Sequence, residues 1–141
     1  MDNTVYVHRL LSDILYLCKA AHINHPAVNE TIAYLTKSQS FILNFILDMI
    51  KEHFDLTQEE LESDSKDTVF VQARRAYYCL AKTETTASLA VIGSMVKKDH
   101  ATVLHSIKKM HEELNPTKDI EWTKFKDIEN KFHKEFNKIP G

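Results

Sequence analysis

The chain has 141 residues and only 2 glycines, Gly93 and Gly141, against an average usage of roughly 7 per cent. Dinucleotide-binding fingerprints and phosphate-binding P-loops both need several clustered glycines, so both motifs are excluded in their usual form. With 3 prolines as well, turn residues are too few for a β-sandwich or barrel, and we predict an all-α fold. The formal net charge of −2 does not by itself indicate a nucleic-acid-binding protein.

Charge is unevenly distributed along the chain. Residues 1–68 carry 5 basic and 11 acidic side chains, whereas residues 69–111 carry 7 basic and 2 acidic side chains. A basic segment inside an acidic chain is the electrostatic footprint expected of a local nucleic-acid contact.

Targeting signals are not evident. The start lacks the basic region of a secretory signal, and the most apolar run, 41–50, is far shorter than the ~20 residues of a membrane span. Cys18 and Cys79 lie in apolar helical patterns and form no CxxC motif. We therefore expect a cytoplasmic protein with reduced cysteines and no membrane contact.

Residues 1–40 are predicted to form an N-terminal helical arm or hairpin. A first helix can be capped by Asn3 or Thr4, and a second helical pattern starts at Val28 after a turn. This second pattern either continues through Phe54 or breaks near Ser38, and we favour a break. The arm either folds onto the rest of the chain or serves as a homodimerisation or partner-binding device, and we favour the second reading.

Residues 41–138 are predicted to form one helical domain. Thr57 and Glu60 have the spacing of a capping box before a short helix, 58–63. Further helices are predicted at 69–83, 89–96, 100–114 and 120–138, the last with an apolar stripe of Trp122, Phe125, Ile128, Phe132 and Phe136. Gly93 lies inside a helix, where it costs about 1 kcal/mol relative to Ala, so we expect it to mark a close helix crossing.

The two helices at 89–96 and 100–114, joined by a three-residue turn, have the pattern of a helix-turn-helix unit. Such a unit inserts the start of its second helix into the DNA major groove. The lysines of the turn can neutralise phosphates, and Asp99, Ala101 and Thr102 can contact base edges or a thymine methyl. A plain helical hairpin, in which Asp99 is only an N-cap, fits the pattern equally well.

The run Asp-His-Ala-Thr-Val-Leu-His-Ser from Asp99 strongly resembles the recognition helix of the C-terminal DNA-binding domain of the bacterial replication initiator DnaA family. Ser-Leu-Ala-Val-Ile-Gly at 88–93 is similar to the helix before it. The resemblance covers about residues 41–137 and is most specific at 88–107. It implies a helix-turn-helix domain of about five to six helices that binds double-stranded DNA with some sequence preference, in replication control or transcription.

The resemblance also implies which residues contact DNA. The major-groove readers would be Asp99, His100, Ala101 and Thr102. The preceding basic helix would contribute Arg74 and Arg75. Phosphate contacts would come from Lys82, from the backbone amides of Leu89 and Ala90, and from Lys97 and Lys98 of the turn.

Several departures from the family pattern leave an alternative open. The lysine turn is one residue shorter than the family's Gly-Gly-Arg-type turn, and Ala101 replaces a threonine. The family's basic minor-groove loop aligns with 63–68, which here carries Asp64 and Asp67. The ATPase domain has no counterpart, so we expect neither a nucleotide nor an ATP-switched initiator. The alternative is a helical protein-interaction module that keeps the fold but has lost DNA binding.

Catalytic and metal-binding constellations are not evident. His22 and His25 have no Cys or acidic ligand in register, and His100 and His105 lie about 140° apart on a helix. No nucleophile elbow or glycine-rich oxyanion turn accompanies the serines. We expect neither an enzyme nor a metal or cofactor.

Overall fold

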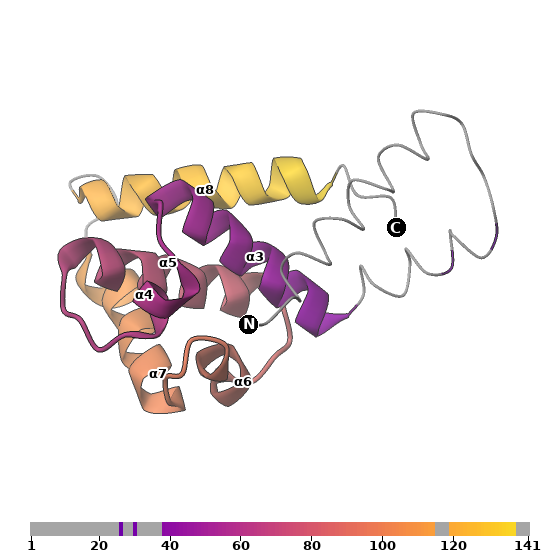
Figure 1. Cartoon of the computed structure of the whole chain (residues 1–141). Coiled ribbons are helices and arrows are strands. Elements are labelled where there is room, and N and C mark those ends of the chain that lie inside the picture. The colour runs from indigo at the N-terminus through magenta and orange to yellow at the C-terminus, as the bar shows by residue number, and fades with distance from the viewer. Residues whose placement is uncertain (1–25, 27–29, 31–37, 115–118, 138–141) are drawn as a thin grey trace.

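The computed structural model describes residues 38–114 and 119–137, together with Pro26 and Glu30. All regular structure in these ranges is helical, which confirms the predicted all-α class (Figure 1). The elements are α3 (Gln39–Phe54), α4 (Gln58–Glu62), α5 (Thr68–Glu84), α6 (Leu89–Ser94), α7 (His100–Lys108), η1 (Lys109–Glu113, a π-helix) and α8 (Ile120–Phe136). The helices predicted before Ser38 lie outside the described residues.

Helix α3 begins at Gln39 because Ser38 caps it. Ser38 has an extended backbone, and its Oγ accepts the backbone N–H of Phe41 at 3.4 Å. The predicted break at Ser38 is therefore confirmed. The boundary that we placed at residue 40 falls in the first turn of this helix, and the arm of residues 1–40 stays a prediction.

The predicted capping box at the start of α4 is present in both directions. Thr57 Oγ1 accepts the N–H of Glu60 at 3.1 Å, and the N–H of Thr57 donates to Glu60 Oε1 at 3.0 Å. Asp67 then caps α5 by accepting the N–H of Val69 at 3.0 Å. These local bonds satisfy amides that a helix start leaves without partners, so both helices begin where the chain supplies an acceptor.

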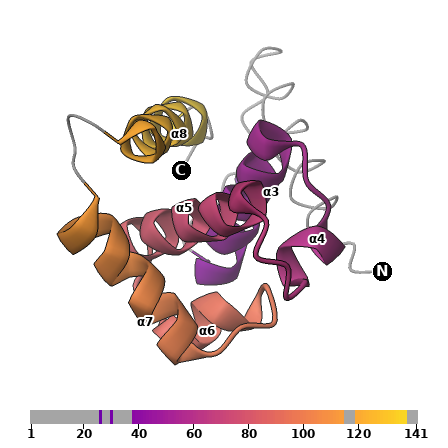
Figure 2. The same cartoon turned by 90° about the vertical axis from the view of Figure 1, so that its left-hand side faces the viewer.

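Helix α5 is the central element of the domain. Every residue of 73–81 is buried, as expected of a helix covered on all sides. Figure 2 shows α5 running through the middle, with α8 on one side and α6 and α7 on the other. The remaining core comes mainly from α3, whose Leu43, Ile46 and Ile50 are fully buried.

The apolar stripe predicted for the last helix faces this core. Phe125, Ile128 and Phe132 of α8 are buried, and Trp122 and Phe136 pack against the core while partly exposed. Phe45 of α3 meets the rings of Phe132 and Phe136 edge-on, at centroid distances of 5.8 and 5.4 Å. Helix α8 is thereby fixed across α3 and α5.

Two predicted helices differ from the observed ones. Helix α6 ends at Ser94 rather than at residue 96, because the chain turns to bury Val96. The helix predicted over 100–114 is α-helical only to Lys108 and closes with a π-turn, in which the N–H of Leu114 donates to the carbonyl of Lys109 at 3.1 Å. An apolar period indicates a helix but does not distinguish an α-turn from a π-turn.

Candidate nucleic-acid interface

Helices α6 and α7 pack against each other to form the predicted helix-turn-helix unit, seen at the bottom of Figure 2. Each has its own side-chain cap: Ser88 Oγ accepts the N–H of Val91 at 3.2 Å, and Asp99 Oδ1 accepts the N–H of Thr102 at 2.8 Å. Ile92 and Val103 are fully buried between the two helices and α5. The unit is thus anchored to the core from inside.

The first turn of α7 is turned outward. Asp99, His100, Ala101 and Thr102 are all exposed, and Leu104 beyond them is 39 % exposed. The structure therefore brings together the four residues predicted to read the major groove. His105 is exposed on the same helix.

Asp99 acts as an N-cap, as the hairpin reading also expects. The hydrogen bond from the N–H of Thr102 lowers the pKa of Asp99 below its usual value. The carboxyl group is therefore ionised at neutral pH, with one oxygen engaged by the helix and the group fully exposed to a partner.

The two turn lysines have different environments. The Lys97 side chain is 73 % exposed, and its Nζ lies 3.7 Å from the carboxylate of Glu62. The Lys98 side chain is 13 % exposed, and its Nζ donates to the carbonyls of Glu62 and Ser63 at 2.8 and 2.9 Å. It also pairs with Asp64 at 3.2 Å. Lys97 is available to a partner, whereas Lys98 holds the α4–α5 loop (63–67).

The two consecutive arginines of α5 are both buried. Arg74 is 8 % exposed, and its Nε donates to the carbonyl of Leu61 at 2.7 Å. Its Nη1 and Nη2 donate to the carbonyls of Ser65 and Ser63 at 3.0 and 2.7 Å. Arg75 forms an ion pair with Glu121 of α8 at 2.5 Å. The structure thus places Arg75 against α8 rather than beside the start of α7.

The remaining predicted phosphate contacts lie at helix ends. Lys82 is exposed in the last turn of α5. At the start of α6 the Ser88 cap engages the amide of Val91. Leu89 and Ala90 are the first two residues of α6. Their backbone N–H groups therefore lie in the first helical turn, where a helix supplies no acceptor for them.

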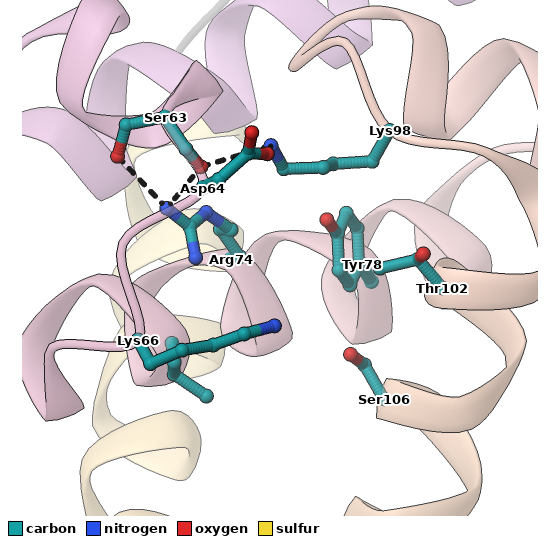
Figure 3. A pocket seen from close by; sticks show the side chains of 9 residues that line it. Ser63, Asp64, Lys66, Arg74, Tyr78, Lys98, Thr102 and Ser106 are labelled. Atoms are coloured by element: carbon teal, nitrogen blue, oxygen red, sulfur yellow. Dashed lines mark hydrogen bonds and ion pairs between the residues drawn. The ribbon is translucent and has the colours of Figure 1, made fainter.

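A cavity of about 220 Å³ lies between the α4–α5 loop, α5 and α7 (Figure 3). It is lined by Ser63, Asp64, Lys66, Val71, Arg74, Tyr78, Lys98, Thr102 and Ser106. Lys66, Tyr78 and Ser106 are not among the predicted site residues. A four-residue spacing could have found two of them, because it places Tyr78 one turn after Arg74, and Ser106 one turn after Thr102.

The described residues contain no group of three or more His, Cys, Asp or Glu that could hold a metal ion. None of the helices they form is long and apolar enough to cross a membrane. The His22–His25 pair lies outside the described residues.

The fold and the exposed first turn of α7 define a helix-turn-helix domain. Residues 43–110 match the family model described as the bacterial dnaA protein helix-turn-helix. This segment belongs to the C-terminal helix-turn-helix family of DnaA, which confirms the resemblance seen in the sequence.

Curated relatives point to the same family. The chain is 36 % identical over 104 residues to the chromosomal replication initiator protein DnaA of Bacteroides thetaiotaomicron. The aligned region covers 72 % of this chain and 21 % of the relative. The DnaA protein of Flavobacterium psychrophilum is 39 % identical over 90 residues, 63 % of this chain and 18 % of the relative. The chain thus spans about a fifth of the length of these relatives. No solved structure matches it significantly.

Proposed function

We propose that this domain binds double-stranded DNA with the first turn of α7 in the major groove, with some sequence preference, in replication control or transcription. The observation that carries the proposal is the outward-facing cluster Asp99, His100, Ala101 and Thr102 at the start of a helix anchored by buried Val103. Helix-turn-helix domains read base edges with the N-terminal residues of this second helix.

The contacts divide into readers and phosphate binders. We assign base reading to Asp99, His100, Ala101 and Thr102, because their side chains are exposed together. Phosphate contacts fall to exposed Lys97 and Lys82, and to the amides of Leu89 and Ala90 at the start of α6.

Two buried arginines and the partly buried Lys98 support this surface from within the domain. Arg74 and Lys98 hold the α4–α5 loop beside α7, and Arg75 holds α8 against α5. We propose that Arg75 affects DNA binding only through this packing, whereas Arg74 and Lys98 face the cavity beside Thr102.

A second candidate function is a protein-interaction module that no longer binds DNA. The observation that favours it is the pair of carboxylates next to the turn: Glu62 lies near Lys97, and Asp64 pairs with Lys98. These charges would repel a phosphate backbone at the place where the turn meets it.

Fluorescence anisotropy of labelled duplexes across a salt series separates the two functions. For a DNA-binding domain, the logarithm of the association constant should fall linearly with the logarithm of the salt concentration. Lys97→Gln should make this slope shallower by about 0.9, the value for one lost phosphate contact. Asp64→Asn should raise affinity, because this exposed carboxylate faces the DNA. Lys124→Gln, at an exposed lysine of α8, is the matched control and should change neither quantity. Absence of binding at low salt in both the parent and Asp64→Asn would favour the interaction module.

We propose that residues 1–40 form a dimerisation or partner-binding arm. A small DNA-binding domain gains affinity for DNA when dimerisation doubles its contacts. Sedimentation of the chain with and without residues 1–37, a deletion that keeps the Ser38 cap of α3, tests this assignment. A smaller oligomer with cooperative unfolding supports the arm. Loss of cooperative unfolding would mean that these residues belong to the core.

A further inference from the structure

Arg74 and Arg75 are neighbours on α5 and equally buried, yet their charges are balanced differently. Arg75 Nη1 meets both carboxylate oxygens of Glu121, at 2.5 and 2.7 Å. Arg74 meets no carboxylate in the described part of the chain, and its guanidinium is held by backbone carbonyls and by Ser63 Oγ. A buried charge is costly unless it is paired. Arg74 therefore lacks the anion that its neighbour has.

The cavity beside Arg74 could receive that anion. Its lining contributes three cationic side chains, Lys66, Arg74 and Lys98, against one carboxylate, Asp64. Figure 3 shows Arg74 and Lys66 on the loop side of the cavity and Thr102 and Ser106 on the α7 side, with Tyr78 between them. The volume of about 220 Å³ is several times the ~30 Å³ that one water molecule occupies in the liquid.

The cavity wall also offers hydroxyl donors. Tyr78 is 1 % exposed, and its Oη has no hydrogen-bond partner in the described protein. Burial raises the pKa of Tyr78 to about 12, so the phenol stays protonated at neutral pH and can donate. Thr102 and Ser106 bring two more hydroxyl groups to the same cavity. Neutral donors beside cations suit an anion that carries several oxygen atoms.

We propose that this cavity is a binding site for a phosphate-type oxyanion, with Arg74 and Lys66 supplying charge and Tyr78, Thr102 and Ser106 donating hydrogen bonds. The oxyanion comes either from free phosphate or from the backbone of a duplex seated on α7. Only the second source depends on the proposed function. Thr102 lies both on the reading turn and in the cavity wall, so it would connect the two sites.

Asp64 occupies the position where the anion would meet Lys98. Its carboxylate lies 3.2 Å from Lys98 Nζ and is fully exposed. An ion pair in which one partner is fully exposed to water contributes little stability. An oxyanion can therefore displace the carboxylate, and Asp64→Asn should strengthen oxyanion binding.

The first test titrates the ¹⁵N-labelled full chain with inorganic phosphate, with ionic strength held constant by sodium chloride. Amide resonances of 63–66 and of Thr102 and Ser106 should shift saturably. Tyr78→Phe should weaken binding about tenfold, as expected for one hydrogen bond to a charged group. Tyr77→Phe is the matched control, because the Tyr77 hydroxyl donates to the carbonyl of Ile92 at 2.8 Å and Tyr77 is not part of the cavity wall.

Two variants of exposed lysines test phosphate binding without changing a core residue. Lys66→Gln should weaken phosphate binding, whereas Lys124→Gln on α8 should leave it unchanged. Circular dichroism of each variant confirms folding, so that a lost titration reports binding.

The second test measures duplex affinity of the two tyrosine variants. If phosphate alone shifts the resonances and Tyr78→Phe weakens this binding while Tyr77→Phe does not, the site binds free oxyanion. If phosphate has no effect but Tyr78→Phe weakens duplex binding while Tyr77→Phe does not, the oxyanion is a backbone phosphate. If the parent binds no duplex, the proposed function fails and the phosphate titration alone decides. Equal behaviour of both tyrosine variants in both tests would overturn the proposal.

Discussion

Gly93 of α6 lies directly against the backbone of Lys98 in the turn before α7. A β-carbon on Gly93 would collide with the carbonyl oxygen of Lys98 and would lie 3.0 Å from Cγ2 of Val103. The same two residues are joined by a hydrogen bond from the N–H of Lys98 to the carbonyl of Gly93, at 2.9 Å. The close crossing expected from a mid-helix glycine is therefore present, and it sets the distance between the two helices.

Gly93→Ala should destabilise the domain although alanine favours a helix. The propensity gain of about 1 kcal/mol is smaller than the combined cost of overpacking, about 1–3 kcal/mol, and of disturbing the bond to Lys98. Urea unfolding monitored by circular dichroism measures the change. Ser94→Ala, at the neighbouring exposed position, is the control. A more stable Gly93→Ala variant would show that the helices can separate at no cost.

Lys97→Gly should stabilise the domain by about 0.5–1 kcal/mol. Lys97 has a φ of 56°, a left-handed conformation that costs a side-chain-bearing residue roughly 1–2 kcal/mol. Glycine removes this strain but loses more entropy on folding. Thermal unfolding at low protein concentration measures the gain. Lys98→Gly should instead be destabilising, because Lys98 Nζ holds the loop carbonyls, and a gain there would contradict this account.

Tyr78→Phe and Tyr77→Phe should differ in their effect on stability, and only Tyr77→Phe should lower it. The Tyr78 hydroxyl is buried without a protein partner, so its removal should leave stability unchanged or raise it by up to about 1–3 kcal/mol. The Tyr77 hydroxyl donates to the carbonyl of Ile92, so its removal should cost about 1 kcal/mol or more. Unfolding free energies of the two variants, measured without phosphate in the buffer, give the comparison. Equal losses would mean that Tyr78 Oη is satisfied.

Alkaline pH should unfold the domain progressively. Burial raises the pKa of Tyr78 from 10.0 to about 12 and that of Cys79 from 9.0 to about 12. The folded chain therefore keeps protons that the unfolded chain loses. The stability that these two groups contribute is lost by about 1.4 kcal/mol per pH unit and per group, from about pH 9 upward for Cys79 and from about pH 10 upward for Tyr78, until pH approaches 12. Urea midpoints between about pH 8 and about pH 11 should decline, with tyrosinate absorbance rising on unfolding. A constant midpoint would refute this coupling.

Asp99→Asn tests whether the cap also reads a base. Asparagine caps a helix about as well as aspartate, so folding is preserved while the charge is removed. If Asp99 accepts from a base amino group, affinity for a selected duplex should fall by roughly 1–3 kcal/mol, while affinity for a scrambled duplex should stay equal or rise. Anisotropy on both duplexes gives the difference. Equal gains on both would assign Asp99 to capping alone and specificity to His100, Thr102 or DNA shape.

Local signals in the sequence predicted most helices of the domain. The Thr57–Glu60 capping box, the break at Ser38 and the stripe of α8 all depend on neighbours within one or two turns, and the structure confirms each. The π-turn after Lys108 was missed because periodicity does not report hydrogen-bond register.

The surroundings of the buried arginines could not be predicted for a different reason. The pairing of Arg75 with Glu121 spans 46 positions along the chain, and the cage of carbonyls around Arg74 arises only when the loop folds back on α5. The same holds for the cavity, whose walls come from three separate segments. Contacts of this kind depend on tertiary packing rather than on residue type.

The hydrogen bonds from Arg74 to the α4–α5 loop leave the side chains of that loop free to change. Its guanidinium holds main-chain oxygens of Leu61, Ser63 and Ser65, which every amino acid possesses. Substitutions in the loop can therefore alter its side chains from acidic to basic or neutral while its path is retained. The charge presented beside α7 can therefore change while the backbone path stays the same, and that path does not determine which partner the loop attracts or repels.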